Sequence, residues 1–191
     1  MDKKNRQHKE AVRRKRKAES VLTDIGFQLK DPLCAIGLIF EHIGLSQLAI
    51  EALKNIEKIS NEYAGIDTVV FLRRFTPSIT NVTASVFSIR DIIEWDQPLI
   101  ASNISTCLDA LNSRAQLIYH YVYDLDFINN LTIPTEDIVE TFCNPRIKIF
   151  TRSKYYKPII EQEFDIKVIK IIENFDLKKM LNVISGDMKN V

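Results

Sequence analysis

The distribution of glycine limits what this chain can fold into more than any other feature of its sequence. The chain has 191 residues and five glycines, and residues 66–185 contain none. Dinucleotide-binding Rossmann domains need glycines in their first turn for close approach to the pyrophosphate, and P-loop proteins need them to wrap backbone N–H groups around a phosphate. Both kinds of site are therefore excluded from residues 66–185. Any ligand there must be bound by side chains, helix N-termini or a partner domain.

Beyond Gly65 the sequence alternates between short apolar runs and short amphipathic segments. Most of the apolar runs are continuous, as expected for strands that are buried on both faces of a parallel sheet. The predicted strands are Thr68–Leu72, Ala84–Ser88, Pro98–Ala101, Leu117–Tyr123, Ile147–Thr151 and Lys167–Ile172. The predicted helices are Ile104–Leu111, Glu136–Phe142, Lys154–Phe164 and Leu177–Ile184. This alternation predicts an α/β fold with a mostly parallel, Rossmann-like sheet flanked by helices.

The residues before Gly65 predict helices only. Apolar residues recur at helical spacing over residues 18–29, and Asp31-Pro32 is a favourable helix start ahead of the apolar stretch Leu33–Ile43. Ser46 is placed to cap a further helix, which Gly65 ends. We therefore expect a basic arm over residues 1–17, a helical N-terminal region over residues 18–65 and a Rossmann-like α/β domain over residues 66–191.

The arm carries a charge opposite to that of the rest of the chain. Residues 1–17 hold nine Lys or Arg and two acids, a net charge of +7, whereas residues 18–191 hold 17 basic and 23 acidic groups, a net charge of −6. Such a run favours binding to nucleic acid or another polyanion, and it would also serve a protein partner or simple solvation. It has no aromatic residue for base stacking, so base-specific reading is not expected. The cluster expected to bind polyanions is Arg13, Arg14, Lys15, Arg16 and Lys17.

Cysteine use and hydropathy indicate a cytoplasmic protein. The three cysteines are odd in number and widely spaced, which argues against a disulfide framework and for a reducing compartment. The longest apolar run has eight residues, far short of the roughly 18–20 that a membrane span needs. Abundant Ile, Asn and Lys with little Gly and Ala indicate an AT-rich genome, as in many phages. The expected location is therefore a cytoplasm, or a virion if a phage encodes the chain.

Two carboxylates follow the predicted strand Leu117–Tyr123. Asp124 and Asp126 would lie at the carboxyl end of that strand, where ligands bind in open α/β sheets. An Asp-x-Asp after a strand resembles the signature of glycosyltransferases with a single Rossmann-like domain. That resemblance implies that the two catalytic carboxylates hold a divalent metal, Mg²⁺ or Mn²⁺, on the diphosphate of a sugar nucleotide. The alternative is a solvated turn or a helix cap.

A pair of arginines follows the predicted strand Thr68–Leu72. Arg73 and Arg74 would also lie at the carboxyl ends of the strands, and guanidinium groups are good ligands for phosphate. We expect them to bind substrate. The alternative is that they form ion pairs with the acidic body of the chain.

The last two predicted strands also end in polar residues. The first leads to Ser153, the expected N-cap of the next helix, and the second leads to Glu173-Asn174-Phe175-Asp176. This order resembles the end of the first domain in two-domain glycosyltransferases of the GT-B fold. There a strand provides a serine at a helix start, and a later strand ends near Pro-Asn-Gly-Val-Asp. The resemblance covers residues 66–184 and implies that Ser153 and Asn174 bind substrate, although Phe175 stands where the motif has glycine.

Two functional hypotheses follow. In the GT-B fold a second Rossmann-like domain binds the sugar nucleotide, whereas this sequence ends fifteen residues after Asp176. The first hypothesis is therefore a glycosyltransferase-like protein, dependent on a sugar nucleotide and incomplete without a partner domain. The alternative is a non-enzymatic phage or virion scaffold, or an accessory protein, that uses its basic arm to bind nucleic acid or a larger assembly.

Overall fold

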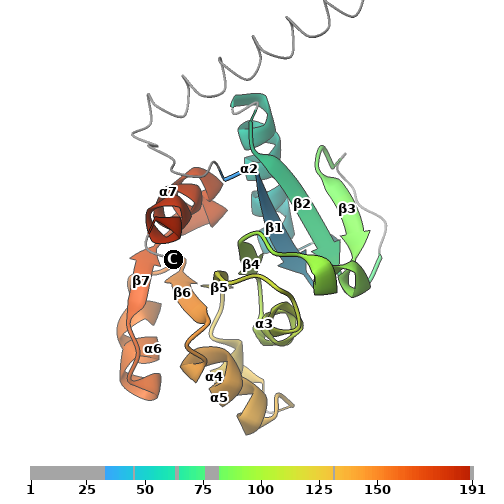
Figure 1. The fold of residues 1–191 in the computed structure, drawn as a ribbon. Helices are drawn as coiled ribbons and strands as arrows, with labels where there is room; N and C mark the ends of the chain where they lie inside the picture. The colour runs from blue at the N-terminus through green and yellow to red at the C-terminus, as the bar shows by residue number, and fades with distance from the viewer. Residues whose placement is uncertain (1–32, 45, 63–64, 76–81, 131, 190–191) are drawn as a thin grey trace, which may run out of the picture.

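The computed structural model describes residues 33–189 except residues 45, 63–64, 76–81 and 131, and it shows a seven-stranded sheet with helices on both faces (Figure 1). All strands are parallel, in the order β3-β2-β1-β4-β5-β6-β7. The strands are β1 (Ala35–Phe40), β2 (Asp67–Leu72), β3 (Ser85–Ser88), β4 (Leu99–Ala101), β5 (Ile118–Val122), β6 (Ile147–Thr151) and β7 (Val168–Ile171). The helices are α2 (Gln47–Glu62), α3 (Ile104–Leu111), α4 (Asp126–Asn129), α5 (Thr135–Cys143), α6 (Tyr156–Phe164) and α7 (Leu177–Met188), with the 3₁₀ helices η1 (Ile89–Glu94) and η2 (Glu173–Phe175). The predicted α/β class with a parallel, Rossmann-like sheet is confirmed.

The stretch Leu33–Ile43, predicted to be helical, instead contains β1, an interior strand of the sheet. β1 pairs with β2 on one side and with β4 on the other, and five of its six residues are buried. A continuous apolar run is buried on all sides in either a helix or a central strand, so its periodicity does not distinguish the two. Gly37 lets β1 pack closely against β4, because a Cβ atom at this position would lie only 2.5 Å from Leu99 Cδ2.

The helix predicted after Ser46 is confirmed as α2. The Ser46 hydroxyl accepts a hydrogen bond from the backbone N–H of Ala49 at 3.1 Å, as an N-terminal cap should. The basic arm and the helix predicted over residues 18–29 lie outside the described residues. None of the helices within the described ranges combines the length and apolar character that crossing a membrane requires.

The two faces of the sheet pack against different sets of helices. α2 and α7 contact each other and cover one face, where Ile56 and Ile184 join the same apolar core as Leu38 of β1 (Figure 1). Helices α3, α5 and α6, together with η1, cover the other face, with Phe142 and Ile160 in its core. Because both faces are covered, β1, β2, β4 and β5 are buried over nearly their whole length, which explains why their sequence pattern is continuous.

The strand order fixes where a ligand site is expected. From β1 the chain proceeds outward to β2 and β3, then returns past β1 to β4 and continues outward to β7. The direction of progression therefore reverses between β1 and β4. In open α/β sheets, ligands bind outside the carboxyl ends of the strands at such a topological switch point.

Candidate functional site

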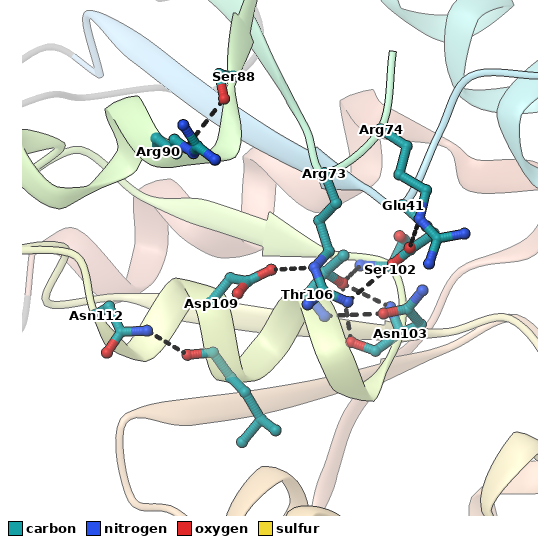
Figure 2. Close-up of polar contacts among 11 residues, drawn as sticks. Glu41, Arg73, Arg74, Ser88, Arg90, Ser102, Asn103, Thr106, Asp109 and Asn112 are labelled. Carbon is teal, nitrogen blue, oxygen red and sulfur yellow. Dashed lines mark hydrogen bonds and ion pairs between the residues drawn. The ribbon is translucent and has the colours of Figure 1, made fainter. Parts of the chain in front are cut away.

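Polar segments from three strands meet at the switch point. Glu41 directly follows β1, the pair Arg73-Arg74 follows β2, and Ser102 and Asn103 connect β4 to α3. Figure 2 shows these side chains gathered around the first turns of α3. The two arginines thus lie at the edge of the sheet where the sequence predicted them.

Arg73 is held between two carboxylates. Its Nη1 lies 3.1 Å from Glu41 Oε2, and its Nε lies 2.8 Å from Asp109 Oδ2 on α3 (Figure 2). Arg74 Nε lies 3.2 Å from the other oxygen of Glu41. Burial raises the pKa of Asp109, the Arg73 guanidinium lowers it, and Glu41 raises it again. The two cations and two anions balance, so the cluster ties the ends of β1, β2 and α3 together without a net charge.

The two arginines differ in what they offer a ligand. The side chain of Arg73 is 36% exposed, whereas that of Arg74 is 77% exposed. The terminal nitrogens of Arg74 have no hydrogen-bond partner among the residues that the structure describes. The structure therefore contains the ion pairs that the sequence allowed as an alternative. Phosphate binding by Arg74 stays a prediction.

The start of α3 is closed by a reciprocal cap. Asn103 Oδ1 accepts a hydrogen bond from the backbone N–H of Thr106 at 2.8 Å. In return, Thr106 Oγ1 accepts hydrogen bonds from the backbone N–H groups of Asn103 at 2.9 Å and Ser102 at 3.0 Å (Figure 2). This capping box turns the chain from strand to helix without a glycine.

The two aspartates that follow β5 have different surroundings. Asp124 Oδ1 lies 2.6 Å from Arg152 Nη2 and accepts a weak hydrogen bond from the Tyr156 hydroxyl at 3.4 Å. The Arg152 guanidinium also lies 4.0 Å from the centre of the Tyr123 ring, which fixes this ion pair further. Asp126 begins α4, and burial together with the charge of Asp124 raises its pKa.

The aspartate pair gives no further indication of a metal. Over the part of the chain that the structure describes, no group of three or more His, Cys, Asp or Glu side chains is placed to hold a metal ion. Asp124 already has Arg152 as a cationic partner. Mg²⁺ or Mn²⁺ on Asp124 and Asp126 therefore stays a prediction, and so does their catalytic role.

Ser153 lies in the turn before α6 and does not cap the helix as predicted. The N-cap is Tyr155, two residues later, and the Ser153 hydroxyl accepts a hydrogen bond from the Tyr155 backbone N–H at 3.1 Å. The side chain therefore stabilises a turn that precedes the helix. Whether it also contacts substrate stays a prediction.

Asn174 and Phe175 both have left-handed backbone conformations, with φ of 54° and 50°. The Asn174 carbonyl accepts a hydrogen bond from Asn55 Nδ2 on α2 at 3.0 Å, and the Phe175 N–H donates to the Tyr121 hydroxyl at 3.2 Å. The Phe175 ring is fully buried, with its centre 4.9 Å from that of Tyr121. Burial of the ring offsets the backbone strain that a glycine would avoid.

A hollow of about 280 Å³ lies beside the start of α3. Its lining consists of Asn103, Ile104, Ser105, Asp126, Asn130, Thr132, Ile133, Pro134 and Asp137. A second, much smaller space of about 10 Å³ shares three of these residues and is also lined by the buried His120. Within the described residues, neither lining contains a Lys or Arg.

The sequence patterns did not single out several residues of this edge. Glu41 was not predicted because the apolar run before it has the pattern of a helix. Asp109 was not predicted because its partner, Arg73, lies 36 residues away in the sequence. His120 lies in the middle of β5, whose five residues are all buried, so no alternation of polar and apolar residues marked it.

Neither the basic arm nor similarity to known proteins adds a residue to this site. The predicted polyanion-binding cluster at residues 13–17 lies outside the described residues. Comparison with protein-family models, with curated proteins and with solved structures found no match to this chain.

Proposed function

We propose that this chain is a glycosyltransferase-like protein in which the carboxyl edge of the sheet binds a sugar nucleotide and a partner domain completes the site. One observation carries the proposal. The cluster of Glu41, Arg73, Arg74 and Asp109 lies at the switch point between β1 and β4, with a polar hollow near the same edge. That is the position at which open α/β sheets bind nucleotides.

The charges at the edge suggest where the diphosphate of a sugar nucleotide would bind. Arg74 is the most exposed cation of the cluster, and its terminal nitrogens point to no carboxylate among the described residues. A diphosphate that contacts Arg74 would form charge-assisted hydrogen bonds, which are about twice as strong as neutral ones. It would compete with Glu41 for that guanidinium.

The backbone of the same edge offers little to a diphosphate. The loop from β1 to α2 contains Gly44 as its one glycine, and the Gly44 N–H donates to His42 Nδ1 at 3.1 Å. That N–H is therefore engaged within the loop. The donors that a phosphate-binding loop normally supplies must come from another chain or domain, which is why the proposal includes a partner.

Two further features support the glycosyltransferase reading at the level of the fold alone. The sheet is parallel and Rossmann-like, as the resemblance implies. Asn174 and Phe175 have the left-handed backbone that a glycine in the related motif would adopt without strain. Because one fold hosts many functions, these two features agree with the proposal but do not by themselves distinguish it from other functions of the same fold.

The test is a thermal-shift panel of sugar nucleotides on the full chain, with Mg²⁺ or Mn²⁺. A donor at 100 times its dissociation constant should stabilise the protein by about 2.7 kcal/mol. Arg74→Ala should reduce that stabilisation. The matched control is Arg114→Ala, which removes an exposed arginine paired with Glu94 away from this edge. No shift with any donor would refute binding by the isolated chain, and equal losses in the two variants would place binding elsewhere.

The charge split of the sequence favours a second candidate function. A net charge of +7 over residues 1–17 against −6 over the remainder suits a non-enzymatic phage or virion scaffold, or an accessory protein, that attaches to nucleic acid or a larger assembly through its arm. This role needs no ligand at the sheet edge. The salt dependence of DNA binding, considered in the Discussion, separates it from the first candidate.

A further inference from the structure

His120 is a buried polar side chain that the fold leaves without a partner. It lies on β5, is 3% exposed, and its Nδ1 makes no hydrogen bond to any residue in the described ranges. Burial lowers the pKa of His120 to about 3, so the imidazole is neutral at physiological pH. Buried polar groups in folded proteins are nearly always hydrogen-bonded, so an unpaired one points to a water or a ligand that is bound in solution.

The space next to His120 has room for that partner. The imidazole lines a cavity of about 10 Å³ together with Asn103, Asp126 and the ring of Phe142. A volume of about 10 Å³ is the smallest that admits one water molecule, and it admits nothing larger. Because Asn103, Ile104 and Asp126 line both this cavity and the hollow of about 280 Å³, a water bound to His120 would lie beside whatever occupies the hollow.

The hollow itself offers both donors and acceptors. The carboxylates of Asp126 and Asp137 and the Ser105 hydroxyl make no hydrogen bonds with other described residues. Asn103 and Asn130 use their side-chain oxygens within the protein, to accept from Thr106 and Thr132, and so present their amide nitrogens as donors. Carboxylates accept from hydroxyl groups, and amides donate to them.

The lining also indicates which ligands are disfavoured. Two carboxylates and no cation among the described lining residues repel a phosphate or a carboxylate ligand. A metal ion is also disfavoured, because no three metal-ligating side chains come together among the described residues. Ile104, Ile133 and Pro134 supply a limited apolar surface that suits the C–H groups of a sugar ring.

We propose that this hollow binds an uncharged polyhydroxylated ligand, a sugar or similar polyol, and that His120 anchors one of its hydroxyl groups through a single buried water. Asp126 accepts a hydrogen bond from a second hydroxyl at the mouth of the same cavity. This site requires neither a sugar nucleotide nor a partner domain. Its test can therefore fail or succeed independently of the glycosyltransferase proposal.

The test is an NMR titration of the ¹⁵N-labelled full chain with D-glucose, D-galactose, D-mannose and N-acetyl-D-glucosamine, each added separately. At least one sugar should shift the backbone amides of Ile104, Ser105 and Asp126 in a saturable way. A ligand of this size should bind with a dissociation constant of roughly millimolar order. The 6-phosphate of the sugar that binds should bind about tenfold more weakly, because of the two carboxylates. No shift with any of the four sugars, or tighter binding of the phosphate, would overturn the proposal.

Variants assign the residues. Asp126→Asn keeps the shape of the side chain and should weaken binding about tenfold, since charged acceptors bind hydroxyl groups more strongly than neutral ones. The control, Asp67→Asn, changes an exposed aspartate at the opposite end of β2 and should bind as the wild type does. Equal affinities for the two variants would contradict the assignment. Ser105→Gln, which fills the hollow from an exposed position, should block binding and serves as the check if Asp126→Asn does not fold.

The role of His120 has its own readout. His120→Phe replaces the imidazole, whose centre lies 5.3 Å from that of the Phe142 ring, with another aromatic ring and removes both nitrogens. It should weaken sugar binding while leaving the melting temperature unchanged or higher, because the unpaired nitrogen is lost. Wild-type affinity in this variant would show that no water on His120 takes part.

Discussion

Arg146 joins the end of α3 to the start of β6, and we predict that Arg146→Met destabilises the fold by about 3 kcal/mol. Its Nη1 donates to the Leu111 carbonyl at 2.9 Å, and its Nη2 donates to the carbonyls of Ser113 at 3.2 Å and Ala115 at 2.7 Å. These carbonyls lie at and beyond the C-terminal end of α3, where a cation also interacts favourably with the helix dipole.

The magnitude follows from the number of hydrogen bonds and their exposure. A hydrogen bond to a charged group contributes about 1.5–3 kcal/mol. Arg146 is only partly buried, and water would replace some of the lost partners, so we count about 1 kcal/mol for each of the three bonds. Methionine retains the apolar stem of the side chain, which keeps the packing loss small.

The measurement is equilibrium unfolding in urea, followed by the fluorescence of Trp95, the one tryptophan of the chain. The matched control is Arg114→Met, whose ion pair with Glu94 spans 2.7 Å between side chains that are 67% and 70% exposed. Exposed pairs of this kind contribute about 0–1 kcal/mol. If the two variants unfold at the same urea concentration, the argument from the three backbone carbonyls is wrong.

Three further predictions concern packing, a buried hydroxyl and the arm. Gly37→Ala should destabilise the protein by about 1–3 kcal/mol in calorimetry, because the new methyl group meets Leu99 Cδ2 at 2.5 Å; an unchanged melting temperature would contradict that contact. Tyr121→Phe should lower the free energy of unfolding by about 1–3 kcal/mol, because the Tyr121 hydroxyl donates to the Ile172 carbonyl at 2.8 Å and accepts from the Phe175 N–H at 3.2 Å. The control, Tyr155→Phe, changes an exposed side chain and should leave thermal unfolding unchanged. Deleting residues 1–17 should abolish binding to duplex DNA. For the intact chain, the slope of log K against log salt concentration should be about −5 to −8. Equal DNA binding by both forms would show that the arm serves a protein partner or is simply solvated.

The strands after Gly65 were predictable because each is a short apolar run bounded by polar residues. All six lie within one residue of the predicted bounds, and Ile147–Thr151 matches at both ends. The first strand, Ala35–Phe40, was not predictable in this way. It is flanked by further apolar residues, so the run is long enough for a helix, and its partners β2 and β4 lie far along the chain.

The candidate site was predictable only in part, because its geometry depends on the order of strands in the sheet. Residues that follow a strand are visible in the sequence, and that rule found Arg73, Arg74 and Asp124. Which of them meet depends on β1 lying between β2 and β4, and hydrophobic periodicity carries no information on that order. The rule also missed Glu41, the residue that binds both arginines, because the strand that precedes it was predicted to be a helix.

The absence of glycine from residues 66–185 and the ion pairs at the switch point have a common consequence for how this edge is built. Where a phosphate-binding loop would use backbone N–H groups, this edge is shaped by side chains: the capping box of α3 and the carboxylates that hold Arg73. Ion pairs and hydrogen bonds hold these side chains before any ligand binds, and such preorganisation lowers the entropy lost on binding. An anionic ligand on the terminal nitrogens of Arg74 must, however, compete with the Glu41 carboxylate, which already lies 3.2 Å from Arg74 Nε. An uncharged ligand in the neighbouring hollow faces no such competition. The isolated chain should therefore bind neutral polyols more readily than sugar nucleotides, and a partner that supplies further cations would reverse that order.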